Sequence, residues 1–315
     1  MKKINVLSLC DGMSCGQIAL RELGIEVDTY YSCEIDINAI KVTMDNFPNT
    51  IQLGDLMNFV KQVDKDNEII LNKELLKELP TIDLVIFGSP CRSISKATAG
   101  RKEYNNGLNG VSWLFYPCNE ILQWIIKYNN KEVLFMVENV DGNNKKDIDE
   151  ISKNLGVEPL LINSNLFSAQ DRLRNYWTNI PIGMFPTENN VVIKDIMDND
   201  IEEKFFYKED FDYYGDYKKV CATLHINGHD ILKRVNNKNY KCPTLTACRG
   251  GNHQKKVYDN GRCRKLTPNE YRKLQTIPNW VKMNVSNTGI YNLCGDGWTI
   301  EVIKHIFNGI KSILM

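Results

Sequence analysis

The stretch from Ile82 to Cys91 constrains the fold of this chain more than any other. Its first part, Ile82–Phe87, is short and mostly apolar, which is typical of a buried strand in a parallel sheet. The run ends at Gly88–Pro90, so we expect Cys91 just past the carboxyl end of the strand, where open α/β sheets carry ligands and chemistry. Because Pro90 stiffens the turn, the Cys91 thiol is well placed to be a nucleophile. The alternative interpretation of Cys91 is one more small buried residue.

A second candidate site lies near the N-terminus. The strand pattern Ile4–Leu9 runs into a turn of mostly small residues, Cys10–Gly16, and then into a helical pattern. Such a turn lets the backbone approach a ligand closely, and the following helix presents free N–H groups. The turn is not Gly-x-Gly-x-x-Gly, which argues against a dinucleotide pyrophosphate. A nucleotide-type cofactor that carries a carboxylate also suits this helix end.

Acidic residues end the next two predicted strands. Glu34 follows Val27–Cys33, and Asp55 follows Ile51–Leu53 and a glycine. In doubly wound folds an acid at the end of the second strand accepts hydrogen bonds from ribose hydroxyls. Asp55 is placed to accept from an exocyclic adenine amine. Asp36 is a candidate N-cap for the following helix. The sequence leaves open which of Glu34 and Asp36 contacts the ligand and which caps the helix.

Three longer stretches predict other elements of structure. Residues 61–80 are charged and predict a helical excursion on the surface. Residues 92–110 are polar with several glycines, which is typical of a mobile lid and equally of an ordinary connection. Residues 111–128 predict an amphipathic helix that contains Pro117.

A second set of polar groups follows the apolar strand Val133–Val137. Glu138 stands at its end, where a carboxyl group can hold a raised pKa and act as a protonated donor. Farther along, strand alternation would place Gln170, Arg172 and Arg174 on one face. Two guanidinium groups on one face need an anionic or polar target, because burying them alone is costly.

Composition excludes several classes of protein. No apolar run is long enough to cross a bilayer, and the N-terminus resembles a first strand rather than a signal peptide. The ten cysteines show no zinc spacing, so we expect reduced thiols in a cytoplasmic protein. The formal net charge is zero, but residues 195–216 are acidic and residues 231–273 carry twelve Lys and Arg. This basic segment fits a local phosphate-contacting surface, or simply a solvated face.

In order along the chain, these motifs resemble those of the DNA cytosine-5 methyltransferase family nearly from end to end. The most specific combination is Pro90-Cys91, then Glu138-Asn139-Val140, then Gln170-x-Arg172-x-Arg174. The C-terminal third agrees with the same family in three further segments: Thr244–Ala247 with Gly250-Gly251, Arg264–Pro268 with Glu270, and Gly295–Trp298.

The resemblance implies an α/β fold with a doubly wound, mostly parallel sheet of the Rossmann-like S-adenosylmethionine-dependent methyltransferase type. A second, smaller target-recognition domain is implied as well. We expect residues 1–185 with 285–315 to form the catalytic domain, and residues 186–284 to form the small domain and hinge. The implied activity is that of a DNA (cytosine-5-)-methyltransferase, which transfers a methyl group from S-adenosylmethionine to C5 of cytosine in double-stranded DNA.

The resemblance assigns the chemistry to four side chains. Cys91 is implied to add as a thiolate to C6 of a flipped-out cytosine, which makes C5 nucleophilic. Glu138 would protonate or hydrogen-bond N3, and Arg172 would brace the O2 edge. Arg174 would orient its neighbours or contact phosphate. A cation beside Cys91 would also lower the pKa of its thiol.

The remaining site residues are implied by the same family motifs. Expected cofactor contacts come from the strand-end turns, namely Cys10, Asp11, Gly12, Ser14, Cys15, Gly16, Glu34, Ile35, Asp55, Leu56, Pro90, Asp296, Trp298 and Thr299. Expected DNA contacts come from the loop after Cys91 and from the recognition region, namely Arg92, Ser93, Gln170, Thr244, Leu245, Arg249, Gly250 and Gly251. No metal is expected. We expect a monomer that binds double-stranded DNA and no membrane, with a cognate restriction endonuclease left open as a partner.

The chain departs from the family pattern at both cofactor turns. Cys10 stands where the family usually has Phe, Ser14-Cys15 where it often has Gly-Gly, and Asp296 where Asn is usual. Three alternatives remain open. They are the same chemistry on transfer RNA, a DNA- or cofactor-binding regulator without catalysis, and a nicotinamide-dependent oxidoreductase. The last would need a pyrophosphate turn that the sequence lacks.

Overall fold

The computed structural model describes residues 2–63, 68–91, 94, 107–110, 112–142, 144–187, 189–248 and 251–314. The chain divides into two compact units. Unit 1 comprises Met1–Ile162, Leu173–Gly183 and Ile303–Met315, and unit 2 comprises Asn163–Arg172 and Met184–Val302. The division differs from the expected domain boundaries, because residues 163–172 and 285–302 group with unit 2.

Unit 1 is built around a seven-stranded sheet with the strand order β3-β2-β1-β6-β7-β10-β8. Neighbouring strands from β3 to β7 run parallel, whereas β10 is antiparallel to β7. The strands are β1 Ile4–Leu9, β2 Val27–Cys33, β3 Ile51–Gly54, β6 Leu84–Gly88, β7 Leu134–Val140, β8 Leu160–Asn163 and β10 Leu173–Thr178. The carboxyl ends of β1, β2, β3, β6 and β7 therefore meet at one edge of the sheet, as the predicted fold class requires.

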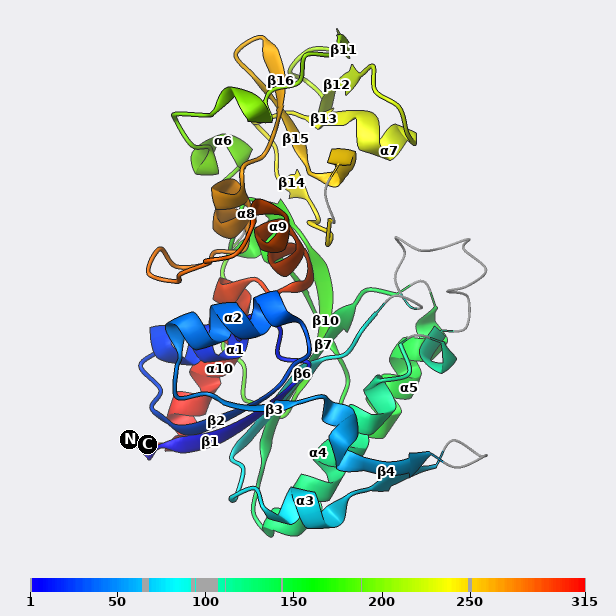
Figure 1. Ribbon diagram of the computed structural model, residues 1–315, viewed down its shortest axis with the longest axis vertical. Coiled ribbons are helices and arrows are strands. Elements are labelled where there is room, and N and C mark those ends of the chain that lie inside the picture. The colour runs from blue at the N-terminus through cyan, green and yellow to red at the C-terminus, as the bar shows by residue number, and fades with distance from the viewer. Residues whose placement is uncertain are drawn as a thin grey trace. The chain divides into compact units, whose positions relative to one another are not determined.

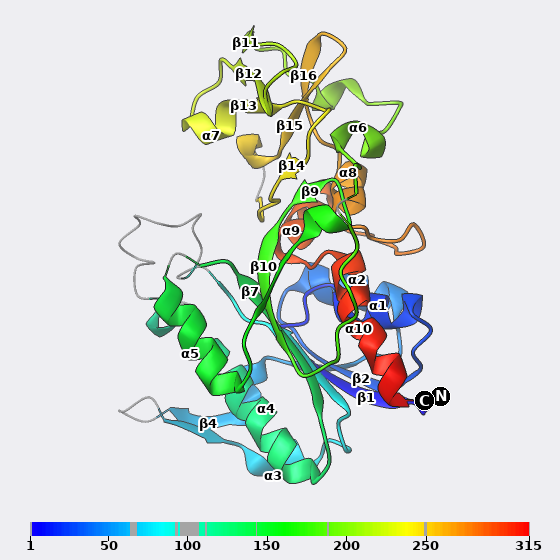
Figure 2. The same ribbon diagram turned by 180° about the vertical axis from the view of Figure 1, so that it is seen from behind.

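Helices cover both faces of this sheet, as Figures 1 and 2 show. Helices α1, α2 and α10 lie on one face, and α4 and α5 lie on the other. Their bounds are α1 Cys15–Glu22, α2 Ile37–Asn46, α4 Phe115–Asn129, α5 Lys145–Leu155 and α10 Ile300–Leu314. Strand β6 contributes side chains such as Val85 and Phe87 to a large core with α4. The predicted doubly wound α/β class is confirmed.

The excursion after β3 differs from the prediction of a charged helix over residues 61–80. A 3-10 helix, Leu56–Phe59, leads into the antiparallel hairpin of β4 (Val60–Val63) and β5 (Ile69–Leu71), and only then into the short helix α3 (Lys73–Lys77). Leu71 and Leu76 bury their side chains in the core. Strands of four and three residues are too short to give a periodic signal that outweighs the charged composition in a sequence-based prediction.

Unit 2 contains a five-stranded sheet with the order β11-β12-β13-β15-β16. Its strands are β11 Phe211–Tyr213, β12 Val220–Leu224, β13 Arg234–Asn236, β15 Lys256–Asp259 and β16 Arg262–Lys265. A small core of Ala222, Leu224, Val235 and Cys263 lies against this sheet. A separate parallel pair joins β9 (Gln170–Asp171) to β14 (Cys242–Pro243).

The helices of unit 2 are short. They are α6 Ile193–Ile196, α7 Asp230–Lys233, α8 Pro268–Leu274 and α9 Asn287–Asp296, with 3-10 turns at Ser164–Leu166, Glu203–Phe205 and Gly251–His253. Helix α8 begins as the sequence predicts. Thr267 caps it by accepting from the Glu270 N–H, Glu270 accepts in return from the Thr267 N–H, and Pro268 occupies the first turn.

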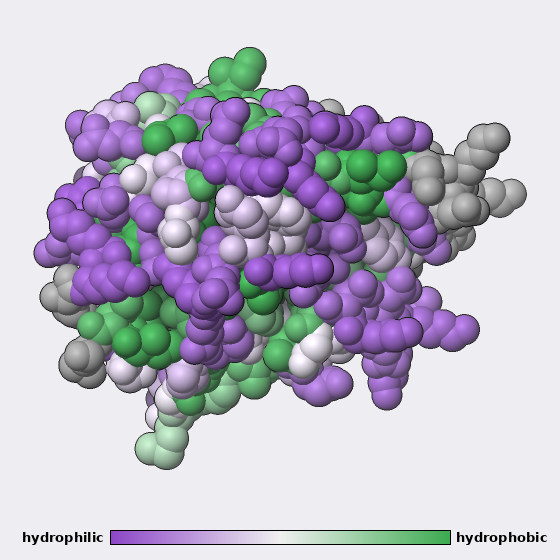
Figure 3. Space-filling view, turned by 90° about the horizontal axis from the view of Figure 1, so that it is seen from below, coloured by the Kyte–Doolittle hydropathy of each residue, from purple (hydrophilic) through white to green (hydrophobic). Residues whose placement is uncertain are grey.

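Polar side chains cover most of the face shown in Figure 3, and apolar side chains reach the surface there only in smaller patches. Scattered apolar residues at a surface are ordinary for a globular protein. Among the helices that the structure describes, none combines the length and the apolar character needed to cross a bilayer.

Candidate active site

The turn that carries Cys91 is tied to the neighbouring strand. Gly88 at the end of β6 pairs in register with Glu138 on β7. The side-chain amide of Asn139 donates to the Ser89 carbonyl oxygen at 3.4 Å and to the Ser89 hydroxyl at 3.2 Å. Cys91 follows two residues later and is partly exposed. The two motifs that the sequence placed at separate strand ends therefore meet at one point of the sheet edge.

Glu138 and Arg174 form an ion pair at this same edge. The distance from Arg174 Nε to Glu138 Oε1 is 3.1 Å, and the two side chains are only 13% and 11% exposed. Tyr176 is directly opposite Glu138 in the antiparallel ladder, so Arg174 lies two residues away along β10 and reaches the carboxylate diagonally. A nearly buried carboxylate thus has a guanidinium partner that fixes its position.

Arg172 lies in a different setting from Arg174. Strand β9 ends before it and β10 begins after it, so Arg172 stands at the break between two strands, whereas Arg174 lies within β10. The Arg172 side chain belongs to unit 2 and donates to three carbonyl oxygens. These are Leu245 O at 2.9 Å, Gly295 O at 3.0 Å and Gly297 O at 2.9 Å.

The first turn is organised from inside by Asp11. Its buried carboxylate accepts from the hydroxyls of Tyr30 at 2.8 Å and Ser32 at 2.9 Å, and also from that of Ser14. Burial raises the pKa of Asp11 to about 6, although these hydrogen bonds act to lower it. Asp11 therefore holds the turn together from within.

The backbone of this turn is unusual at several positions. Cys10, Gly12 and Ser14 all have positive φ, at 54°, 58° and 57°. That conformation is unfavourable for a residue other than glycine, and at Ser14 it accompanies hydroxyl contacts to Asp11 and to Thr43 Oγ1 at 3.0 Å. A Cβ atom at Gly16 would lie 2.2 Å from Ile86 Cδ1, so a larger residue there would require the end of the Ile86 side chain to shift.

Glu34 links the first turn to the second strand end. Its Oε2 accepts from the Gly12 N–H at 2.6 Å, and its Oε1 accepts from the Ile35 and Asp36 N–H groups at 2.7 and 2.8 Å. A carboxylate can accept about four hydrogen bonds, so Glu34 retains acceptor capacity for a hydroxyl group. The neighbouring Ile35 side chain is 70% exposed, which leaves an apolar surface beside that acceptor.

The structure separates the roles that the sequence left open for Glu34 and Asp36. Asp36 caps helix α2 by accepting from the Asn38 and Ala39 N–H groups at 2.8 and 3.1 Å. Asp55 likewise caps the 3-10 helix, by accepting from the Met57 N–H at 2.9 Å. The Asp55 side chain is exposed and follows β3, the neighbour of β2 in the sheet. Glu34 and Asp55 are therefore acidic groups at adjacent strand ends.

The last predicted cofactor turn lies in unit 2, at the end of helix α9. Asp296 is exposed, whereas Trp298 and Thr299 are buried at 8% and 1% exposure. Thr299 Oγ1 donates to Gln275 Oε1 at 2.7 Å and also lies 2.9 Å from Ser164 Oγ. Of these three residues, only Asp296 presents its side chain at the surface.

The expected DNA-binding residues fall into two groups. Gln170 and Leu245 are 0% and 1% exposed, and Gln170 Oε1 accepts from the Leu245 N–H at 2.8 Å, so both side chains serve the interior of unit 2. Thr244 is partly exposed, and residues 246–247 are exposed. Gly251 begins a 3-10 turn. The other expected contacts, Arg92, Ser93, Arg249 and Gly250, lie outside the described residues, as does most of the expected lid over 92–110.

Part of the basic segment is structural. Arg264 is fully buried, where it donates to both oxygens of Glu270 at 2.8 Å and to Asp259 at 2.8 Å. Lys256 is also buried and donates to the carbonyl oxygen of Asn252 at 2.6 Å. Burial lowers the pKa of Lys256 to about 8. A count of basic residues along the sequence therefore overstates the positive charge available to phosphates.

Sequence reasoning missed several residues that shape these sites. Tyr30 and Ser32 lie within strand β2, and only their alternation toward α1 could have marked them. Asn139 was recognised as part of a motif but not as the residue that holds the Cys91 turn. Gln275 carries no sequence signal, because it follows a helix rather than a strand.

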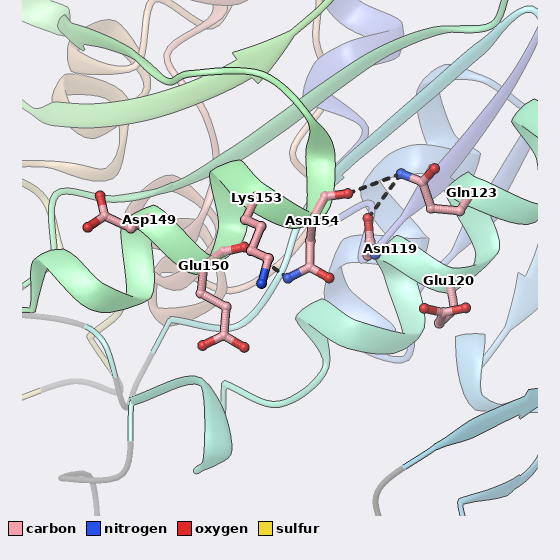
Figure 4. A pocket seen from close by; sticks show the side chains of 7 residues that line it. All are labelled: Asn119, Glu120, Gln123, Asp149, Glu150, Lys153 and Asn154. Atoms are coloured by element: carbon pink, nitrogen blue, oxygen red, sulfur yellow. Dashed lines mark hydrogen bonds between the residues drawn. The ribbon is translucent and has the colours of Figure 1, made fainter.

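Two further features of the described residues concern metal binding and a hollow on unit 1. In the described parts of the chain, no group of three or more His, Cys, Asp or Glu side chains is arranged to hold a metal ion. A polar hollow lies between α4 and α5, lined by side chains that include Gln123 and Glu150 (Figure 4). None of the expected catalytic, cofactor or DNA contacts lines that hollow.

Comparison with known proteins adds a family assignment to this geometry. Residues 4–312 match the model of the C-5 cytosine-specific DNA methylase family. The chain is 26% identical, over 99% of its length and 100% of the relative's, to the type II methyltransferase M.Bsp6I of Bacillus sp. (strain RFL6). It is 30% identical to the orphan methyltransferase M.Rho11sI of Bacillus phage rho11s, over 62% of this chain and 36% of that protein.

Solved structures show the same fold at lower sequence identity. The chain resembles the Entamoeba histolytica methyltransferase EhMeth with a TM-score of 0.68 and 15% identity, covering 100% of both chains. It resembles the S. pombe Dnmt2 methyltransferase with a TM-score of 0.66 and 14% identity, covering 99% of both.

Proposed function

Because this chain belongs to the C-5 cytosine-specific DNA methylase family, we propose that it methylates C5 of cytosine within a specific sequence of double-stranded DNA, with S-adenosylmethionine as methyl donor. The observation that carries the proposal is the strand-end cluster of unit 1. There the Cys91 turn is bound to Asn139, and Glu138, which precedes Asn139, is paired with Arg174.

The proposed chemistry begins at the Cys91 sulfur. Cytosine C5 is a weak nucleophile, and a thiolate that forms an Sγ–C6 bond pushes the displaced electron pair toward C5 and N3. When its carboxyl group carries a proton, Glu138 donates a hydrogen bond or that proton at N3 and so stabilises the negative charge that develops on the ring. The donor would supply the methyl group: its methyl–sulfonium bond would break as C5 attacks, and S-adenosylhomocysteine would leave. A base would then take the C5 proton, the freed electron pair would re-form the C5–C6 double bond, and the Sγ–C6 bond would break to release the Cys91 thiolate.

The two arginines take different parts in this proposal. Arg174 orients Glu138, which the 3.1 Å ion pair supports, and it shares the charge of the activated ring. For Arg172 the family resemblance suggested a contact with the O2 edge of cytosine. Its three carbonyl acceptors favour a positioning role instead, in which it holds Leu245 against the turn at Gly295.

Residues at the strand ends fit an adenosine-type methyl donor. Glu34 retains acceptor capacity for ribose hydroxyls, Asp55 for an adenine amine, and Ile35 offers an apolar surface for the base. The first turn and the N-terminus of α1 provide N–H groups for a carboxylate. When bound, the donor supplies an electrophilic methyl group on a sulfonium centre.

The nucleic-acid contacts are proposed from the exposed residues. The target base must leave the helical stack, because C5 and C6 cannot be reached by Cys91 within a duplex. We assign contacts to Thr244 and to the exposed residues 246–247, and structural support to the buried Gln170 and Leu245. Closure of residues 92–110 over the flipped base remains part of the proposal.

The decisive experiment maps methylation directly. Genomic DNA from cells that express the chain is sequenced after bisulfite treatment, with Cys91→Ser as the matched variant. We expect 5-methylcytosine in one sequence context for the wild-type chain and none for Cys91→Ser. The variant should still bind S-adenosylhomocysteine, since its substitution removes only the nucleophile. Transfer RNA from the same cells is analysed in parallel.

The outcomes separate the alternatives. Methylated cytosine in transfer RNA and none in DNA would move the substrate to RNA while keeping the chemistry. No modified cytosine in either nucleic acid, from a chain that binds the cofactor, would identify a binding protein. Methyl transfer that persists in Cys91→Ser would refute the covalent mechanism.

A further inference from the structure

Gln275 is a buried residue for which the proposed chemistry has no role. It follows helix α8 and is 0% exposed. Its Nε2 donates to the carbonyl oxygens of Cys294 and Gly297, the latter at 3.1 Å. Its Oε1 accepts from Thr299 Oγ1 at 2.7 Å and from Gln170 Nε2 at 3.2 Å. One side-chain amide therefore holds three positions of the 294–299 turn.

Gln170 continues this network to the recognition segment, residues 244–247. While its Nε2 faces Gln275, its Oε1 accepts from the Leu245 N–H at 2.8 Å. Arg172 provides a second connection, because its guanidinium donates to Leu245 O and to the carbonyls of Gly295 and Gly297. Both backbone groups of Leu245 are thereby bound to side chains that also contact the 294–299 turn or its Gln275 anchor.

Direct packing forms a third connection. A Cβ atom at Gly295 would lie 2.3 Å from Ala247 N and 2.3 Å from the Thr246 carbonyl carbon. Backbone thus lies against backbone, and neither segment can shift by much without moving the other. The backbone beside the anchor is also strained, since Thr276 takes a φ of 53° although it is β-branched.

The energetics favour joint movement of the two segments. Gln275 and Gln170 are completely buried, so breaking their hydrogen bonds would leave polar groups without water. A ligand that orders one end of such a network lowers the conformational cost of ordering the other end. The partly exposed Thr244 and the exposed residues 246–247 are the parts of the recognition segment able to meet a nucleic acid.

We infer that Gln275 is a positioning residue that couples cofactor binding at the 294–299 turn to ordering of the recognition segment. The inference rests on the proposed function, with the segment as a nucleic-acid contact, and on the cofactor contact that the family resemblance implies for Asp296, Trp298 and Thr299. Binding of either ligand should then strengthen binding of the other by the same factor.

The test compares wild type, Gln275→Met and a matched control, Gln123→Met. Gln123 also uses its amide in hydrogen bonds, to Asn119 and Asn154, but it lines the hollow of Figure 4 in unit 1. The first readout is hydrogen exchange of a peptide that covers residues 244–248, with and without S-adenosylhomocysteine and with no DNA present. The second is the ratio of DNA dissociation constants with and without S-adenosylhomocysteine, on a duplex methylated by the wild-type chain.

In wild type and in Gln123→Met, S-adenosylhomocysteine should slow exchange of this peptide about tenfold and tighten DNA binding by a similar factor. In Gln275→Met both effects should fall below about threefold. A Gln275→Met chain that keeps the wild-type response would overturn the inference. The inference would also be overturned if the wild-type chain bound S-adenosylhomocysteine without slower exchange at residues 244–248. This measurement tests the inference even if Gln275→Met does not fold.

Failure of the proposed function has a different signature. It appears as absent methyl transfer by the wild-type chain in the sequencing experiment, whatever the exchange data show. Normal methylation combined with an unchanged exchange rate on cofactor binding refutes only the coupling through Gln275.

Discussion

Gly295 offers the sharpest test of the geometry within unit 2. In Gly295→Ala the new Cβ would lie 2.3 Å from Ala247 N and 2.5 Å from Thr246 O, whereas ordinary contacts begin at 3.4 Å. One backbone segment must therefore move by about 1 Å, because neither neighbour is a flexible side-chain end. Overpacking of this kind costs about 1–3 kcal/mol of unfolding free energy. A misplacement of about 1 Å, even from a mutation far from the chemistry, can lower a rate about a hundredfold.

Two alanine substitutions serve as controls in urea unfolding and single-turnover methyl transfer. Gly183→Ala places a Cβ where no atom lies within 4 Å, so its stability should change by less than about 0.5 kcal/mol. Gly309→Ala creates a clash with Pro181 O at 1.8 Å within unit 1, away from the proposed site, and should lower stability with little effect on the rate of transfer. Gly295→Ala should lower both. If Gly295→Ala matches Gly183→Ala in stability, the close backbone contact is not present in solution.

Two further predictions concern the charges of unit 1. The pKa of Asp11 is about 6 in the folded chain and 3.8 without burial, so the folded state holds this proton more tightly. Unfolding free energy should therefore fall by up to about 3 kcal/mol as the pH rises from about 4 to above 6. Urea unfolding across that range should show a flatter profile for Asp11→Asn, and an equally steep one would contradict the assignment. Arg174→Met should cost about 3 kcal/mol by removing the guanidinium partner of the nearly buried Glu138 carboxylate, and adding Glu138→Gln should recover most of that loss. A double-mutant cycle with no coupling energy would argue against the pair.

The parts of the fold that the sequence predicted are those that depend on residues close together in the sequence. Strands β1 and β2 and helix α2 begin and end where hydrophobic pattern and capping place them, and Asp36 occupies the predicted cap. The order of strand ends followed from the motifs, since βαβ connections leave few topologies. The hairpin of β4 and β5 was missed, because two short strands surrounded by charge carry little periodic signal.

The candidate site was predicted less completely, for a physical reason. Sequence placed Arg172 and Arg174 together, but a break in the strand between them gives each a different set of partners. Leu245 and Gln170 were expected at a surface, and both are buried by contacts with residues far away in sequence. Such long-range partners depend on tertiary packing, which local patterns do not encode.

Helix α10 has a consequence for how the chain is made. It carries four fully buried side chains of unit 1, Ile303, Ile306, Phe307 and Ile310, yet residues 184–302 of unit 2 come before them in the chain. A ribosome adds about 5–20 residues per second, so translation of that stretch takes on the order of ten seconds. During this interval all seven strands of unit 1 have been made, but the sheet lacks its last covering helix and exposes an apolar face to chaperones and to other nascent chains. The unit that is started first is therefore the one that is finished last.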